Sequence, residues 1–188
     1  MKKLPLDYLL IVARMFLLLM FLAILVTAIV GYCVLPDQII SRAYSEYDFH
    51  PRNPYSKEYF LGVFVGLAFF FALLGFFSPF FARKPKPGRS NGYWSLSDDY
   101  WNHEENFVLK EKMIDFWFVF TCGTTLLFFA VVLIRHFPVN LSVPRYGSAN
   151  TGFEILVVPW IYIMSRTFCF LTLAVVKWYR IRNTMKKA

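Results

Sequence analysis

Residues 15–35 read MFLLLMFLAILVTAIVGYCVL, a run of 21 residues without a charged side chain. A helix needs about 20 apolar residues to cross a bilayer, because the hydrocarbon core is about 30 Å thick and each residue rises about 1.5 Å. The run is too long for the apolar part of a cleaved signal peptide, and no A-x-A-like site follows it. We therefore expect this run to form an uncleaved membrane-spanning helix.

Three further runs have this length and character. Residues 59–82 and 116–134 contain no charge, and residues 155–176 are interrupted by Arg166. Because lipid cannot satisfy backbone polar groups, such segments are expected to be helices. The composition agrees, with 57% hydrophobic and only 17% charged residues, and it excludes a soluble enzyme or a disordered chain. The predicted fold is all-α, a single membrane domain over residues 1–188 with a four-transmembrane-helix bundle.

The basic residues predict the orientation of this bundle. Thirteen of the 20 Lys and Arg residues lie in the N-terminus, in the loop 83–115 and in the C-terminal tail, and only five lie in the loops 36–58 and 135–154. Positive residues concentrate in cytoplasmic loops, so both termini are expected inside, in a bacterial cytoplasmic (inner) membrane. The net charge of +8 then indicates contact with membrane lipids rather than with nucleic acid.

The cytoplasmic loop contains a segment that predicts a short interfacial helix before the third span. Ser97 is a suitable N-cap, and acidic residues follow it in the first turn. Aromatic and apolar residues come next and are expected to face the membrane: Tyr100, Trp101, Phe107 and Val108. The alternative interpretation of this segment is a docking surface for a cytoplasmic partner.

Two arginines inside the spans are the main candidate polar sites. Arg166 lies near the middle of the fourth span without a carboxylate at its depth, and charge there is expensive. We expect it to bond to helix carbonyls, to a hydroxyl such as that of Thr124 or Thr125, to water, or to a bound anionic group. Arg14 directly precedes the first run, about one turn inside the expected cytoplasmic boundary of the membrane, and can extend its guanidinium to the surface. Both residues have a structural and a functional interpretation.

Other features carry less information about chemistry. Gly62 and Gly66 form a G-x-x-x-G pair in the second span, which permits close helix packing within the chain or in a dimer. The three cysteines lie in three different spans, and the three histidines lie in loops or at span ends without metal-ligand spacing. We therefore predict no catalytic residues, no metal and no cofactor.

Short motifs carry a resemblance to a known family. The segment Leu35-Pro36-Asp37-Gln38-Ile39 closes the first span, Ser56-Lys57 opens the second, and Tyr100-Trp101 precedes the third. The chain thereby resembles a bacterial membrane domain of unknown function that is shared with SdpI-type immunity proteins. It departs from the family pattern at Tyr55, where the family has Trp. The resemblance implies a membrane protein of uncharacterised role, in a family of which one branch acts in immunity or signal transduction.

Together these features predict a non-enzymatic membrane protein. The expected role is that of a partner-binding, immunity-like or sensor-like protein, or of an accessory subunit in a membrane complex. Its expected partners are lipids and either a second membrane protein or further copies of the chain. The alternative function is a small oligomeric transporter or channel that uses Arg166.

Overall fold

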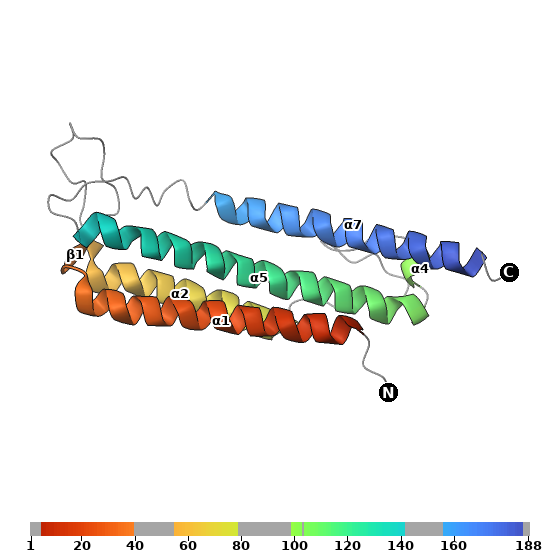
Figure 1. Ribbon diagram of the computed structural model, residues 1–188, viewed down its shortest axis with the longest axis horizontal. Coiled ribbons are helices and arrows are strands. Elements are labelled where there is room, and N and C mark those ends of the chain that lie inside the picture. The colour runs from red at the N-terminus through yellow and green to blue at the C-terminus, as the bar shows by residue number, and fades with distance from the viewer. Residues whose placement is uncertain (1–4, 40–54, 79–98, 103, 142–155, 186–188) are drawn as a thin grey trace.

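The computed structural model describes residues 5–39, 55–78, 99–102, 104–141 and 156–185. These residues form five helices and a two-stranded sheet (Figure 1). Along the chain the elements are α1 (Pro5–Val34), β1 (Gln38–Ile39), β2 (Tyr55–Ser56), α2 (Lys57–Phe76), α4 (Asp99–Asn102), α5 (Glu104–Leu141) and α7 (Val157–Met185). The predicted all-α architecture is confirmed for this part of the chain.

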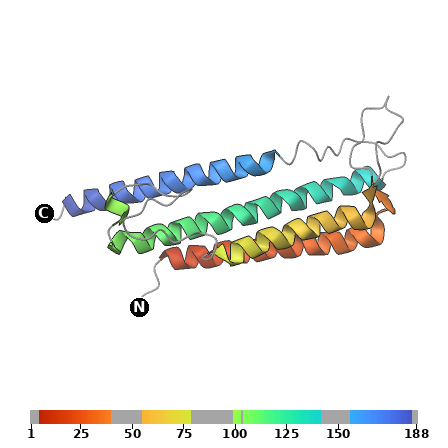
Figure 2. The same ribbon diagram turned by 180° about the vertical axis from the view of Figure 1, so that it is seen from behind.

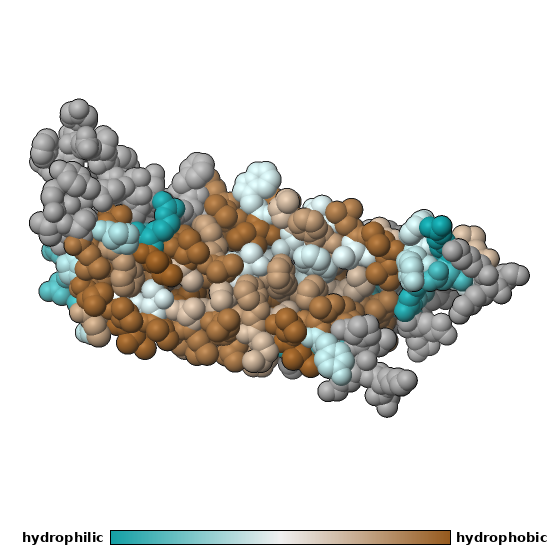
Figure 3. All heavy atoms as spheres, viewed as in Figure 1, coloured by the Kyte–Doolittle hydropathy of each residue, from teal (hydrophilic) through white to brown (hydrophobic). Residues whose placement is uncertain are grey.

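Four helices are long and apolar enough to cross a membrane by length and composition. The apolar segments are Leu6–Val34, Lys57–Phe76, Asn106–Leu141 and Val157–Met185. Apolar side chains cover the middle of the face drawn in Figure 3, and hydrophilic ones gather at its two ends. The sidedness of the bundle stays a prediction.

Three of the helices extend beyond the predicted spans. Helix α1 begins at Pro5, α5 begins at Glu104 and continues past Pro138, and α7 ends at Met185. A helix continues through polar residues as long as its backbone hydrogen bonds continue, so its ends need not coincide with those of an apolar run. Pro138 lies near the C-terminal end of α5, where a lost backbone bond interrupts little of the helix.

The hydrophobic core lies where α1, α2 and α5 pack together. Helices α1 and α5 run in the same direction, and α2 and α7 run in the opposite one (Figures 1 and 2). We call the end where α1 begins and α7 ends the terminal end, and the end that carries β1 and β2 the hairpin end. The most deeply buried side chains of this core come from all three helices and from β1: Leu17, Ile24, Ile39, Ala68, Val119, Leu126 and Leu133.

Close packing in this core depends on glycines other than the predicted pair. A methyl group added at Gly75 would lie 2.5 Å from Leu17 Cδ2, and one added at Gly123 would lie 2.7 Å from Phe16 Cδ1. A methyl group at Gly62 or Gly66 would have no neighbour within 4 Å in the described part of the chain. No close packing of this pair is seen among the described residues, and its role, within the chain or in a dimer, stays a prediction.

Candidate functional site

The motif residues at the ends of the first two predicted spans meet at the hairpin end. The backbone N–H of Lys57 donates to the carbonyl of Asp37 at 2.9 Å, and its ammonium lies 3.1 Å from the Asp37 carboxylate and 3.4 Å from the carbonyl oxygen of Leu35. Strand β1 pairs with β2 in antiparallel register, Gln38 opposite Ser56. Leu35 is buried and Pro36 half-buried beside them. This arrangement joins α1 to α2 and is structural.

Ser56 caps α2 and gives the first testable prediction. Its hydroxyl accepts a hydrogen bond from the Tyr59 backbone N–H at 3.2 Å. Ser56→Ala removes that acceptor, so we expect the free energy of unfolding to fall by about 1 kcal/mol. A denaturant titration in detergent measures the change. Ser56→Asp restores a capping acceptor, and the capping role is wrong if Asp behaves like Ala.

Trp101 does not face outward as predicted. Its side chain is only 1% exposed and belongs to a second, smaller core near the terminal end. Trp101 fits there because α4 lies against the first turns of α5, where the Asn106 side-chain amide donates to the Tyr100 carbonyl at 3.0 Å. Tyr100 and Phe107 are half-buried, and only Val108 is well exposed. The predicted capping residue Ser97 lies outside the described residues.

Polar and aromatic contacts attach α7 to α5 in the half of α7 that lies nearer the terminal end. The Trp117 indole N–H donates to the Thr172 hydroxyl at 3.0 Å, and its ring stacks on Phe168. Arg180 donates to the Asn106 side-chain oxygen at 2.7 Å. The buried residues of α7 lie along one narrow strip: Ser165, Cys169 and Leu173. Most of the remaining surface of α7 is exposed and apolar.

Arg166 lies on this helix next to the buried strip. Its Nε atom is buried and has no hydrogen-bond partner among the described residues, and its guanidinium carbon lies 5.2 Å from the centroid of the Phe170 ring. Thr124 and Thr125, which we expected to bond to it, instead donate to carbonyls of their own helix at 2.9 Å. Arg166 thus keeps a buried donor that no hydroxyl in the described chain satisfies.

Arg14 belongs to a different group of polar residues, near the terminal end. Its Nε is also buried without a hydrogen-bond partner among the described residues. The same holds for one side-chain oxygen each of Ser78, Glu111 and Asp115. Ser78 and Glu111 were not recognised from the sequence, because a polar residue at the edge of an apolar run ordinarily reaches water. Their burial depends on how α1, α2 and α5 pack.

The described residues contain no group of three His, Cys, Asp or Glu side chains that could hold a metal ion. His136 is fully buried in α5, with its ring centroid 4.8 Å from that of Phe60 and its Nδ1 2.8 Å from the Val132 carbonyl. It is thus packed as part of the core at the hairpin end. Nothing in this arrangement indicates ligand chemistry.

Comparisons with protein-family models, with curated proteins and with solved structures gave no match to this chain. The likeness to SdpI-type immunity proteins therefore stays a prediction. What the chain does is inferred from its own residues and their contacts.

Proposed function

We propose that this chain is a non-enzymatic membrane protein that binds a second membrane protein through α7. Its role would be that of an immunity-like or sensor-like protein, or of an accessory subunit in a membrane complex. The observation that carries this proposal is the buried and unpaired Nε of Arg166, on a helix with only one buried strip among its described residues. The partner would supply a transmembrane helix with an acidic residue at the depth of Arg166.

The energetics of a charge in lipid support this assignment. Arg in the middle of a membrane helix costs roughly 2.5–3.5 kcal/mol on insertion scales, and such residues almost always pair with another group. The ring of Phe170 offsets part of this cost through its contact with the guanidinium. A carboxylate would offset more, because a bidentate ion pair is stronger still where water is excluded.

The exposed flank beside Arg166 is apolar, as a helix-binding surface requires. Ile163 lies on the same flank, almost one turn earlier, and its side chain is half exposed. Trp160 extends the apolar surface along α7. Van der Waals packing and a small number of polar contacts hold membrane helices together, and this surface offers both.

The test combines purification with site-specific crosslinking. A photoreactive residue at Ile163 in the full chain, activated in native membranes, should crosslink to one partner in stoichiometric amount. The same residue at Phe168, similarly exposed but on the other side of the buried strip, beside Trp117, should not. Arg166→Met should abolish the Ile163 crosslink and the co-purification, because a buried carboxylate on the partner would lose its cation.

Arg182→Met is the matched control, because Arg182 lies near the end of α7, away from this flank, and contacts Trp178. It removes the same charge and should leave the crosslink intact. The proposal is wrong if Arg166→Met keeps the partner, or if both positions crosslink alike. A crosslink to a second copy of the chain would mean that the partner bound at α7 is another copy of this chain and not a different protein.

A further inference from the structure

Four polar side chains with unsatisfied buried atoms lie near the terminal end of the core. The atoms are Arg14 Nε, Ser78 Oγ, Glu111 Oε1 and Asp115 Oδ1, and none has a hydrogen-bond partner among the described residues. Ser78 is 0% exposed. A buried polar group without a partner costs free energy, so native proteins rarely keep one unless water or a ligand satisfies it. We call these four residues the terminal cluster.

Packing at Gly75 sets the relative heights of these residues. A methyl group there would lie within 3.4 Å of both Leu17 and Cys122, so the three residues are level. Ser78 is three residues from Gly75, and Arg14 is three residues from Leu17. Each is therefore about 4.5 Å closer to the terminal end, at 1.5 Å per residue. Asp115 is seven residues below Cys122, about 10 Å lower by the same rise, and Glu111 is one turn further on.

The residues of α5 in the cluster lie on the side that faces α2. Asp115 comes two turns before Cys122, so both project from the same side of the helix, and Cys122 meets Gly75 of α2 there. Glu111 lies one turn below Asp115 on that side. Side chains in α1 and α5 both point toward the terminal end, so the length of the Arg14 side chain has to cover the difference in level to Asp115.

The chemistry of the cluster is divided along the bundle axis. Arg14 and Ser78 offer hydrogen-bond donors on the side of the hairpin end. Asp115 and Glu111 offer acceptors closer to the terminal end. Donors of this kind bind phosphate oxygens, and carboxylates bind an ammonium group. We propose that the terminal cluster binds the phosphoethanolamine headgroup of a membrane lipid, with its phosphate at Arg14 and Ser78 and its ammonium at Asp115 and Glu111.

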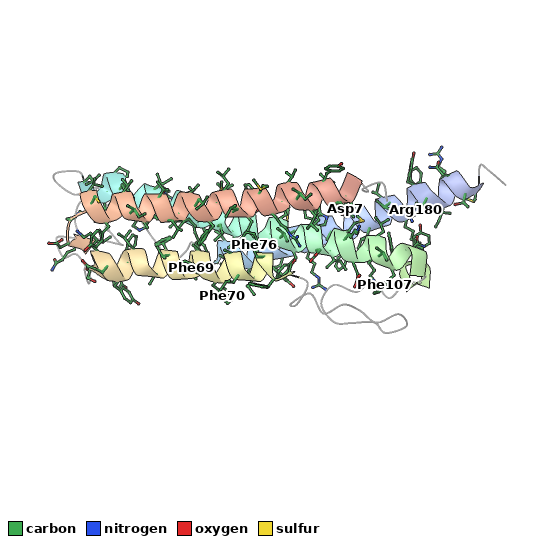
Figure 4. The ribbon with its side chains drawn as sticks, turned by 90° about the horizontal axis from the view of Figure 1, so that it is seen from below. Asp7, Phe69, Phe70, Phe76, Phe107 and Arg180 are labelled. Carbon is green, nitrogen blue, oxygen red and sulfur yellow. The ribbon has the colours of Figure 1, made fainter. Side chains whose placement is uncertain are left out.

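The surroundings of the cluster favour a lipid over a free small molecule. Leu73, Phe76 and Phe77 are exposed around the end of α2 and offer an apolar surface to an acyl chain. Figure 4 shows Phe76 at the end of α2, with Phe69 and Phe70 before it on the same helix, and Asp7 at the start of α1. An acyl chain held along these side chains would run from the headgroup toward the middle of the bundle.

The charges of the terminal cluster favour some lipid headgroups over others. The Lys112 ammonium is paired with the Asp7 carboxylate at 2.7 Å. Within the terminal cluster itself, Arg14 is the one cation and Asp115 and Glu111 are two carboxylates. A phosphatidylglycerol would bring a negative charge beside them without a cation. Phosphatidylcholine has a cation but no N–H to donate, whereas phosphatidylethanolamine donates three. The expected order of affinity is phosphatidylethanolamine, then phosphatidylcholine, then phosphatidylglycerol.

Native mass spectrometry of the full chain in detergent tests this order with dioleoyl lipids. Phosphatidylethanolamine should bind roughly tenfold more tightly than phosphatidylcholine, as expected for hydrogen bonds to charged groups. Asp115→Asn should abolish most of that preference, because it removes the carboxylate that accepts from the ethanolamine N–H groups, and should weaken phosphatidylcholine less. Arg14→Met and Ser78→Ala should weaken both lipids, because both lipids share the phosphate. Arg182→Met is the control and should change neither affinity.

The proposal is wrong if the three lipids bind alike to the unaltered chain, or if Asp115→Asn keeps the preference. If soluble phosphoethanolamine binds as tightly as the lipid, the site takes a small molecule and the lipid assignment is wrong. If Arg14→Met does not fold, Ser78→Ala tests the phosphate contact alone. These outcomes do not depend on α7, so they are separate from the test of the partner-binding proposal.

Discussion

Trp101→Ala is expected to lower the free energy of unfolding by about 3–5 kcal/mol, the range found when a fully buried Trp or Phe is truncated. The large effect follows from the position of the indole, which joins three helices near the terminal end. It belongs to one core with Met113 and Ile114 of α5 and Cys169 and Leu173 of α7, and Leu6 of α1 packs against that core. Loss of the ring would leave a cavity between α5 and α7, where few other described residues of α7 are buried.

Two measurements check this prediction in detergent. A denaturant titration gives the free energy of unfolding, and the rate of labelling by a thiol reagent reports local opening at the buried Cys169. In a background without the exposed Cys33, labelling should be faster in Trp101→Ala than in the unaltered chain. Trp160→Ala is the matched control, since that side chain is 65% exposed. Equal effects of the two substitutions would contradict the burial of Trp101 between these helices.

Gly123→Leu is expected to destabilise the bundle by about 1–3 kcal/mol through overpacking between α1 and α5. A methyl group at this position would lie 2.7 and 2.8 Å from two ring carbons of Phe16 and 3.6 Å from the Leu17 Cα. The Phe16 ring cannot move away freely, because it stacks on Phe120, which in turn stacks on Phe116. The larger Leu side chain would therefore push the two helices apart.

The control for this prediction is Gly66→Leu. A methyl group there would meet nothing within 4 Å in the described part of the chain, so we expect a change within about 0.5 kcal/mol. The same denaturant titration compares the two variants. If Gly66→Leu is as harmful as Gly123→Leu, the position at 66 is packed in the protein, as in a dimer, and the assignment of Gly123 as the close contact loses its support.

The packing glycines could not be recognised from the sequence, for a physical reason. Gly62, Gly66, Gly75 and Gly123 all lie in apolar runs, and a G-x-x-x-G spacing marks only a surface on which close approach is possible. Whether another helix lies against that surface depends on the arrangement of the whole bundle. The same reasoning applies to Trp101, because an aromatic residue next to a span suits both an interface and a core.

For the candidate sites too, some features were evident from the sequence and others were not. The position of Arg166 within an apolar helix was evident from the sequence, as was the location of Leu35 and Lys57 at the ends of two spans. The lack of a hydrogen bond at Arg166 Nε was not evident, since Thr124 and Thr125 were plausible acceptors. Their hydroxyls bond instead to carbonyls one turn earlier, a local choice that costs no rearrangement of the chain.

The sequence by itself determined that the chain has four long apolar helices, because the length and hydrophobicity of a run decide whether it can cross a bilayer. Only the tertiary structure decided which side of each helix is buried. Leu17 and Leu19 are neighbours in one run, yet the first is 0% and the second 60% exposed. When lipid-facing and core-facing positions are equally apolar, hydrophobicity no longer separates them, and shape complementarity between particular side chains makes the choice.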